Sequence, residues 1–350
     1  METTVIIDLR DTSTSAVSAK MVELRDNAGT ILNRVLNLVV VVDSDTDLED
    51  AVETAKEATR EHPCRVLVLL QDGDAGEQPK LDAQIRIGGD AGASEILVLT
   101  LHGELTEHPD AVVLALLLAD TPVVAWWPGD GPVEPAEDRI GALAKRRLVD
   151  ASQAPDPVQR LYDRAPHDTP ADTDLGWARI TRWRALLAAA LDTAPYEQVT
   201  EALVAGSPES PSNELLAAWL ALKLKCPVTL VHTPAGEGVV TVKLMRKDDR
   251  HIELMRPDGV NAVLSQSGRP DRRVELARRD DRAAIAEELR RLDPDEVYHE
   301  VVSKGLPQVI DGDRTEAKDA AEAGLITSRA EAERRTGRAA GQGKEAGREG

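Results

Sequence analysis

The chain has 350 residues, a formal net charge of −20, 42% hydrophobic residues and 2% aromatic residues. This length exceeds the usual limit for a single hydrophobic core, so we expect two domains. The acidic balance disfavours a nucleic-acid binder, because such proteins present a basic field to the phosphate backbone.

Targeting and cysteine signals are absent from the sequence. The longest strongly apolar run, residues 111–119, is too short to span a bilayer, and the N-terminus has no basic segment followed by an apolar one. Cys64 and Cys226 are far apart and lack a Cys-x-x-Cys spacing, which indicates neither a disulfide framework nor a zinc site. We therefore expect a cytoplasmic protein that binds neither membrane nor nucleic acid.

The first half of the chain alternates strands and helices, which predicts an α/β fold. Two runs rich in β-branched residues are typical of strands buried on both faces, and the alternating run at 81–88 indicates an edge or antiparallel strand. The expected strands are 3–9, 34–43, 64–71, 81–88, 94–101 and 122–127, and the expected helices are 12–27, 47–62 and 109–119. We predict a Rossmann-like α/β domain over residues 1–165.

Two tryptophans stand side by side at the end of the last of these strands. Trp126 and Trp127 belong to the stretch TPVVAWWPGDGP at 121–132. Neighbouring side chains of a strand point to opposite faces, so both rings cannot enter the same core. We expect one ring to pack inward and the other to line the contact surface or an interdomain groove, because ligands and partners gather at the carboxyl ends of strands in open α/β sheets. A ring that lies under a helix is the alternative.

The pattern changes after the proline-rich stretch at 153–174. Helices are predicted at 174–192 and 212–224, followed by a strand meander and by one or two closing helices at 281–302 packed on that sheet. The meander strands are expected at 228–233, 239–246, 251–257, 261–267 and 273–279. We predict an α+β C-terminal domain over 170–305 and a disordered tail over 306–350, where no apolar stripe is found.

The helix at 174–192 carries the strongest candidates for a partner interface. Ile180, Trp183, Leu187 and Leu191 form one face, while Arg179 and Arg182 share another. Trp and Arg are enriched at the energetic centres of protein interfaces, although Trp177, Trp183 and Trp219 also fit a core between helices. The candidate interface residues are Trp126, Trp127, Arg179, Arg182, Trp183 and Arg184. The basic clusters at 145–147 and 269–279 are expected to be solvated faces.

Motifs that carry chemistry are missing. The sequence has no GxxxxGK[ST], GxSxG or HExxH, and the glycines at 87–94 have the wrong spacing for GxGxxG and precede a strand. The acidic run at 43–50 is explained by a loop and a helix N-terminus, which favours carboxylates. We therefore predict no catalytic residue, no metal site and no cofactor.

Five stretches, HPCRVLVL, LDAQIRIGG, LLLADTPVVAWWPG, RRLVDAS and DLGWARITRWRALLAAALD, occur in that order. Together they resemble the OpcA family, the glucose-6-phosphate dehydrogenase assembly proteins of actinobacteria and cyanobacteria, over residues 1–305. The resemblance implies a non-catalytic allosteric activator that forms a hetero-oligomer with glucose-6-phosphate dehydrogenase and supports NADPH production in the pentose phosphate pathway. The alternative is a sugar-phosphate or nucleotide sensor, or a weak enzyme, that uses the strand ends near Trp126.

Overall fold

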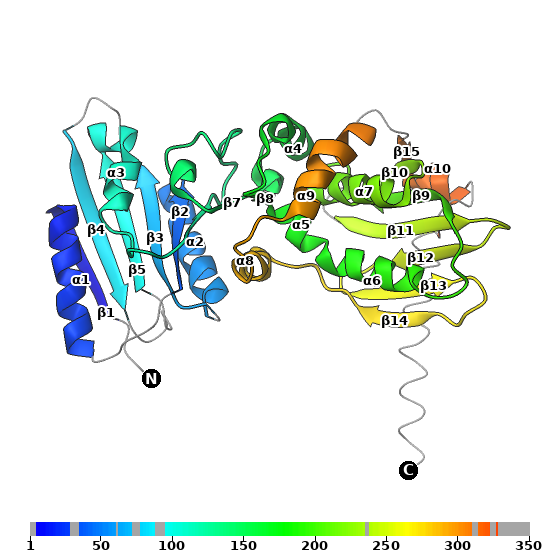
Figure 1. The fold of residues 1–350 in the computed structure, drawn as a ribbon, viewed down its shortest axis with the longest axis horizontal. Helices are drawn as coiled ribbons and strands as arrows, with labels where there is room; N and C mark the ends of the chain where they lie inside the picture. The colour runs from blue at the N-terminus through cyan, green and yellow to red at the C-terminus, as the bar shows by residue number, and fades with distance from the viewer. Residues whose placement is uncertain are drawn as a thin grey trace, which may run out of the picture. The chain divides into compact units, whose positions relative to one another are not determined.

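The computed structural model describes residues 5–28, 35–60, 62–71, 78–87, 95–234, 238–309, 314–322 and 327 (Figure 1). Within these ranges the chain forms two sheets, of eight and seven strands. Its contacts divide it into two compact units. Unit 1 comprises Met1–Pro155, Thr169–Ala178 and Asp280–Asp295, and unit 2 comprises Asp156–Asp168, Arg179–Arg279 and Glu296–Gly350. Each unit is thus assembled from segments that are distant in the chain.

The sheet of unit 1 is mostly parallel. Its strands follow the order β1-β4-β5-β3-β2-β6-β7-β8, and only β4 runs antiparallel to its neighbours. The strands are β1 Val5–Thr12, β2 Leu36–Val42, β3 Cys64–Gln71, β4 Lys80–Ile87, β5 Glu95–His102, β6 Val123–Trp126, β7 Arg146–Val149 and β8 Asp172–Asp174. The first six confirm the expected strands. The short β7 and β8 were not expected, because β7 begins with two arginines and β8 is entirely polar, so neither shows an apolar run.

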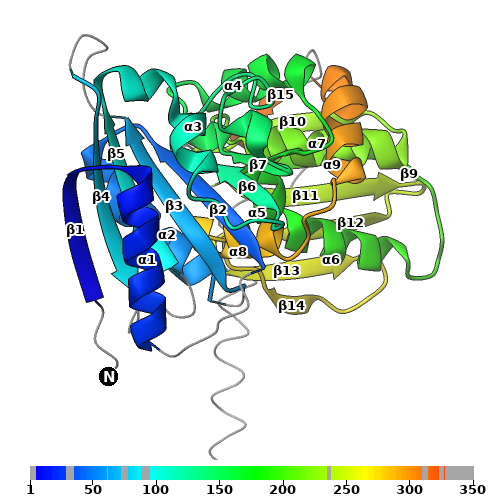
Figure 2. The same cartoon turned by 60° about the vertical axis from the view of Figure 1, so that its left-hand side comes forward.

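Helices cover both faces of this sheet (Figure 2). One core takes in α1, Thr14–Ala28, and α3, Pro109–Leu114, while the other takes in α2, Asp45–Ala58, and α8, Asp281–Leu289. A sheet buried on both faces explains why β2 and β3 are nearly continuous apolar runs. The helix α3 is shorter than the expected 109–119, since it ends at Leu114 and the chain continues in turns, with a positive φ at Asp120, as far as Pro122.

The helix α8 corrects the prediction that the closing helices pack on the C-terminal sheet. Ile285 and Leu289 of α8 instead join the core that contains Val52 of α2 in unit 1. A buried guanidinium adds a second link, because Arg146 of β7 donates a hydrogen bond from Nη2 to Glu288 Oε2 of α8. Apolar burial and a buried charge pair therefore place α8 in unit 1.

The sheet of unit 2 has the order β14-β13-β12-β11-β9-β10-β15. Its strands are β9 Val199–Gly206, β10 Val228–His232, β11 Val239–Arg246, β12 His251–Met255, β13 Asn261–Gln266, β14 Arg272–Glu275 and β15 Arg314–Glu316. The meander is confirmed for β11 to β14, which pair antiparallel in sequence. The prediction that β10 belongs to the meander is wrong, because β10 runs parallel to β9, a central strand that was not predicted.

The predicted helix at 174–192 is two helices. The first is α5, Leu175–Arg179, and the second is α6, Thr181–Leu191, with a break at Ile180, whose φ of −97° and ψ of 4° leave the helical range. The helix α5 lies in unit 1 up to Ala178, and α6 belongs to unit 2. The other helices of unit 2 are α4 Pro157–Arg164, α7 Pro211–Leu224, α9 Glu296–Glu300 and α10 Ala317–Glu322. The nearly all-apolar sequence of α7 agrees with its burial on almost every side.

The prediction of disorder from residue 306 onward is wrong for part of that region. The strand β15 pairs in parallel with β10, and Arg314 forms an ion pair with Glu214 of α7 at 2.9 Å. Ala320 of α10 packs with Leu203 and Val231. Such short elements are ordered by pairing with a sheet that is distant in sequence. The rest of the predicted tail, 310–313, 323–326 and 328–350, and the glycine cluster at 88–94 lie outside the described residues.

We predict that Arg146→Met destabilises the chain by about 3–5 kcal/mol, because Glu288 would remain buried without its partner. The double change to Arg146→Met and Glu288→Met removes both charges and should recover most of this loss. Urea unfolding of the full chain measures the effect. Lys304→Ala, at the exposed Lys304–Glu300 pair, is the control and should cost under about 0.5 kcal/mol. A near-neutral Arg146→Met would contradict the prediction.

Candidate functional site

The tryptophan pair lies on opposite faces of the unit 1 sheet, as alternation along a strand requires. Trp126 is 1% exposed and belongs to the core with α2 and α8, whereas Trp127 is 3% exposed and belongs to the core with α1 and α3. The expectation that one ring lines a contact surface is therefore wrong for this chain. The indole N–H of Trp126 is buried and has no hydrogen-bond partner among the described residues.

An acidic cluster lies at the carboxyl ends of β2 and β6. Gly129 sits directly against Asp43, since a Cβ at Gly129 would come within 2.7 Å of Asp43 Oδ2. Burial raises the pKa of Asp43, and the nearby Asp47 and Asp130 raise it further. Carboxylates at this edge repel phosphate groups. The acidic run that sequence analysis assigned to a loop thus also gathers charge where a nucleotide would otherwise be expected.

Trp183 is a core residue of unit 2. Its ring lies under the guanidinium of Arg256, whose Cζ is 5.2 Å from the ring centroid. Arg256 is itself buried and donates hydrogen bonds to the carbonyl oxygens of Leu276 and Val239, at 3.0 and 2.7 Å. Burial lowers the pKa of Arg256 to about 10. The core interpretation of Trp183 is confirmed, and its cation partner, Arg256, was missed because it lies 73 positions away in the sequence.

The three candidate arginines differ in exposure. Arg182 is exposed, whereas Arg179 and Arg184 are half-buried, and Arg184 Nη2 donates to Thr181 Oγ1 at 3.0 Å. Beside Arg182, the small residues Ala185 and Ala189 are exposed on α6 at helical spacing. The solvent face of α6 therefore combines one cation with alanines that permit close approach. A role of the six candidate residues in partner binding stays a prediction.

The other basic clusters divide between core and surface. Arg146 and Arg147 are buried, and Arg147 forms an ion pair with Asp172 of β8, so the expectation of a solvated face is wrong for them. Arg272 and Arg273 are exposed, as expected. Sequence spacing cannot separate the two cases, because the carboxylate partners of Arg146 and Arg147 come from distant segments.

The edge strand β1 presents exposed apolar side chains. Val5 is 46% exposed and Ile6 is 54% exposed. Among the described residues the strand pairs with β4 alone, since it ends the sheet order, so no described strand lies along its other edge. Such an edge can accept a strand from another protein. It is the second surface of the chain that has the chemistry of a docking site.

The part of the chain that the structure describes shows neither a metal-ligand group nor a membrane-spanning helix. Among these residues no group of three or more His, Cys, Asp or Glu side chains is arranged to hold a metal ion. None of the described helices combines the length and apolar character required to cross a membrane.

Comparison with known proteins identifies related sequences along most of the chain. Residues 55–166 match the family model described as the glucose-6-phosphate dehydrogenase subunit N-terminal domain, and residues 170–302 match that described as the C-terminal domain. A relative from Nostoc punctiforme, named as the OxPP cycle protein OpcA, is 24% identical over 215 residues. The match takes in 57% of this chain and 46% of the relative, so the chain spans about half the length of the protein it matches.

We predict that Asp43→Asn raises the melting temperature at pH 7 by about one degree or less, because Asp43 is exposed enough for solvent to screen much of the repulsion. The folded state raises the pKa of Asp43, so this residue favours folding at low pH and opposes it as the pH rises through the folded pKa. The gain should therefore vanish below about pH 4, near the ordinary aspartate pKa. Thermal unfolding from pH 4 to 8 tests this, with the exposed Asp120→Asn as control. A gain that is independent of pH would contradict it.

Proposed function

The chain belongs to the OpcA family, and from that premise we propose that it is a cytoplasmic, non-catalytic assembly factor that binds glucose-6-phosphate dehydrogenase and stabilises its active oligomer. The observation that carries the proposal is the pair of consecutive family matches, 55–166 and 170–302, both described as glucose-6-phosphate dehydrogenase subunit domains. The order of the five resembling sequence stretches supports the same function. In this proposal the partner enzyme performs the chemistry, and the chain supplies binding free energy.

An assembly factor must distinguish two states of its partner. A protein that binds both states with equal affinity does not change their populations. Moving the ratio of active to inactive partner from 1:99 to 99:1 requires the two states to differ by about 5.5 kcal/mol in binding free energy. A few anchors of the arginine or aromatic type reach this scale at protein interfaces. The allosteric activation that we propose is therefore within the capacity of one ordinary docking surface.

We propose that the docking surface is the solvent face of α6 centred on Arg182. The support is its exposed guanidinium flanked by Ala185 and Ala189, which let a partner backbone approach closely. Trp183 lies on the buried side of the same helix, held by Arg256. Of the predicted interface residues, Arg179, Arg182 and Arg184 would contact the enzyme, while Trp126, Trp127 and Trp183 would keep the scaffold rigid.

We also propose that unit 1 is a Rossmann-like domain without its nucleotide. Six strands of this sheet pair in parallel, in the order β5-β3-β2-β6-β7-β8. Numbered one to six along the chain, they follow the order 3-2-1-4-5-6, which is the doubly wound order. The order reverses between β2 and β6, where such folds bind dinucleotides. Here Asp43, Asp47 and Asp130 occupy that place. Their charge argues against the alternative of a nucleotide or sugar-phosphate sensor at these strand ends.

Mixing the chain with glucose-6-phosphate dehydrogenase from the same organism tests the assembly function. We expect a larger complex in size-exclusion chromatography with mass detection, and a several-fold rise in dehydrogenase activity. Superimposable elution and kinetics with and without the chain would remove the proposal.

Charge reversal locates the docking surface. We expect Arg182→Glu to weaken complex formation by at least about tenfold, since interface arginines often contribute more than 1.4 kcal/mol. Arg272→Glu, an exposed arginine on β14, is the matched control and should bind as the unaltered chain does. Loss of binding in Ile6→Lys together with normal binding in Arg182→Glu would reject the α6 surface in favour of the β1 edge.

Tryptophan fluorescence distinguishes the assembly factor from the alternative, a nucleotide or sugar-phosphate sensor. Trp126 ends β6 and Trp127 follows it, beside the acidic cluster, so a nucleotide bound at these strand ends would change their emission. We expect no saturable change with NADP or ATP up to millimolar concentration. A saturable response that disappears in Gly129→Glu would favour the sensor over the assembly factor.

A further inference from the structure

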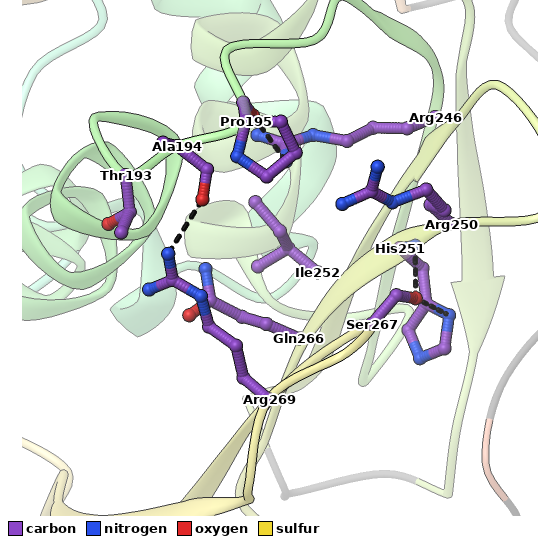
Figure 3. Close-up of a pocket in the computed structure, with 10 residues that line it drawn as sticks. All are labelled: Thr193, Ala194, Pro195, Arg246, Arg250, His251, Ile252, Gln266, Ser267 and Arg269. Atoms are coloured by element: carbon purple, nitrogen blue, oxygen red, sulfur yellow. Dashed lines mark hydrogen bonds between the residues drawn. The ribbon is translucent and has the colours of Figure 1, made fainter.

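The pocket lined by arginines in unit 2 is too small for a ligand (Figure 3). Its lining includes Arg246, Arg250 and Arg269 and no carboxylate, yet it has room for only about 10 Å³, which is about one water molecule. Beside it, Glu197 pairs with Arg250 at 2.7 Å and also attracts Arg246. These arginines therefore have a counter-charge within the chain, and no ligand is needed to explain them.

The C-terminal segment is the stronger candidate, because it is seated on unit 2 as a bound peptide would be. Its described residues, 314–322 and 327, are called the strap below. Figure 1 shows the two elements of the strap, β15 and α10, at the β10 side of the unit 2 sheet. The C-terminal family match ends at residue 302, so it contains every other strand of this sheet and leaves out the strap.

The first end of the strap adds a strand to the edge of the sheet. The three residues of β15 pair in parallel with β10, from Leu230 with Arg314 to His232 with Glu316. Arg314 Nη1 donates to Oε1 of the buried Glu214 at 2.9 Å, and the hydroxyl of Tyr162 donates to Oε2 of the same carboxylate at 2.6 Å. Backbone pairing along an edge, with one side chain recognised beside it, is the chemistry of β-strand addition.

The other end of the strap holds a buried carboxylate on β12. Glu253 is 1% exposed, and its two oxygens accept hydrogen bonds from the backbone N–H and the hydroxyl of Thr327, at 3.0 and 2.8 Å. Between the two ends, Ala320 packs with Leu203 of β9 and Val231 of β10. The strap thus reaches over one face of the sheet from its edge to β12.

The strap buries little of itself. Arg314, Glu316, Lys318 and Asp319 are exposed, and Ala320 is the one strap residue described as buried. Segments with few buried apolar side chains open locally, at a lower free energy than the unfolding of the whole domain. Opening would uncover Leu203, Val231 and the edge of β10, while the rest of the sheet keeps its own pairing.

We propose that this part of unit 2 is a peptide-docking surface, and that the strap is its own built-in occupant, which leaves and returns while the sheet stays folded. The surface consists of the edge of β10, the apolar pair Leu203 and Val231, and the carboxylates of Glu214 and Glu253. It fits an extended segment that begins with a basic side chain and continues with a small apolar residue and a hydroxyl. While the strap is docked, the edge of β10 is closed to strands of other chains.

This inference goes beyond the proposed assembly function. It concerns the sheet of unit 2 and is tested on the isolated chain without the dehydrogenase. Failure of the docking surface would therefore leave the assembly function intact, and failure of complex formation would leave the docking surface intact.

Hydrogen exchange of the full chain, followed by mass spectrometry, tests whether the strap opens by itself. We expect the strap amides to exchange at least about a hundredfold faster than those of β9 and β11. Arg314→Gln and Thr327→Val should each speed the strap by about tenfold and leave β9 and β11 unchanged, because each removes a hydrogen bond to a buried carboxylate. Asp319→Asn, on an exposed strap residue, is the control and should stay within about twofold.

A labelled peptide with the sequence of residues 312–329 tests the surface directly. We expect saturable binding to the full chain that carries Arg314→Gln and Thr327→Val, at least about tenfold tighter than to the unaltered chain, whose own strap competes. Strap amides that exchange in step with β9 and β11 in the unaltered chain would overturn the proposal, whether or not a variant folds. Peptide binding that is no tighter to the folded double variant would overturn it as well.

Discussion

The buried guanidinium of Arg146 is the constraint on which the organisation of the chain depends. It joins three segments that are distant in sequence, since it lies on β7 and donates to Thr173 of β8, to Glu288 of α8 and to the carbonyl oxygen of Asp293. Removing one partner of a buried charge pair is strongly destabilising, so the Arg146–Glu288 pair holds residues 280–295 in unit 1. The residues on either side of that segment belong to unit 2, and the two units therefore share one interleaved chain path.

Four of the five tryptophans of this protein serve its cores. Trp126, Trp127, Trp177 and Trp183 are all buried, and Trp177 donates from its indole N–H to Asp295 at 2.8 Å. Because these tryptophans are buried, arginine is the main residue type left on the surface that can anchor a protein partner. The proposed docking face on α6 depends on an exposed guanidinium group, that of Arg182.

Charge is segregated despite the acidic total. Unit 1 gathers Asp43, Asp47 and Asp130 at the strand ends where doubly wound sheets bind nucleotides, while unit 2 gathers arginines around a pocket that carries no carboxylate in its lining. The net charge of the whole chain hides this contrast. Local fields, which decay within about 10 Å at ordinary ionic strength, decide which anions bind where.

The sequence by itself determined the local and periodic features. Alternation, apolar runs and helical spacing are properties of neighbouring residues. They predicted the first six strands of the first half, the antiparallel run from β11 to β14 and the buried face of α6. The resemblance to the OpcA family was also recognised from five short stretches of the sequence. The candidate interface was only partly accessible, because spacing placed Arg182 on a helix face but could not show that both Trp126 and Trp127 are buried.

Tertiary structure decided what depends on partners distant in the chain. Four features join segments that are far apart in the chain or that lie on separate turns of one sheet. They are the placement of α8 in unit 1, the parallel pairing of β10 with β9 and β15, the burial of Arg146 and Arg147, and the convergence of Arg246, Arg250 and Arg269. No local pattern encodes such encounters, since burial and charge compensation are settled only when the chain has closed on itself.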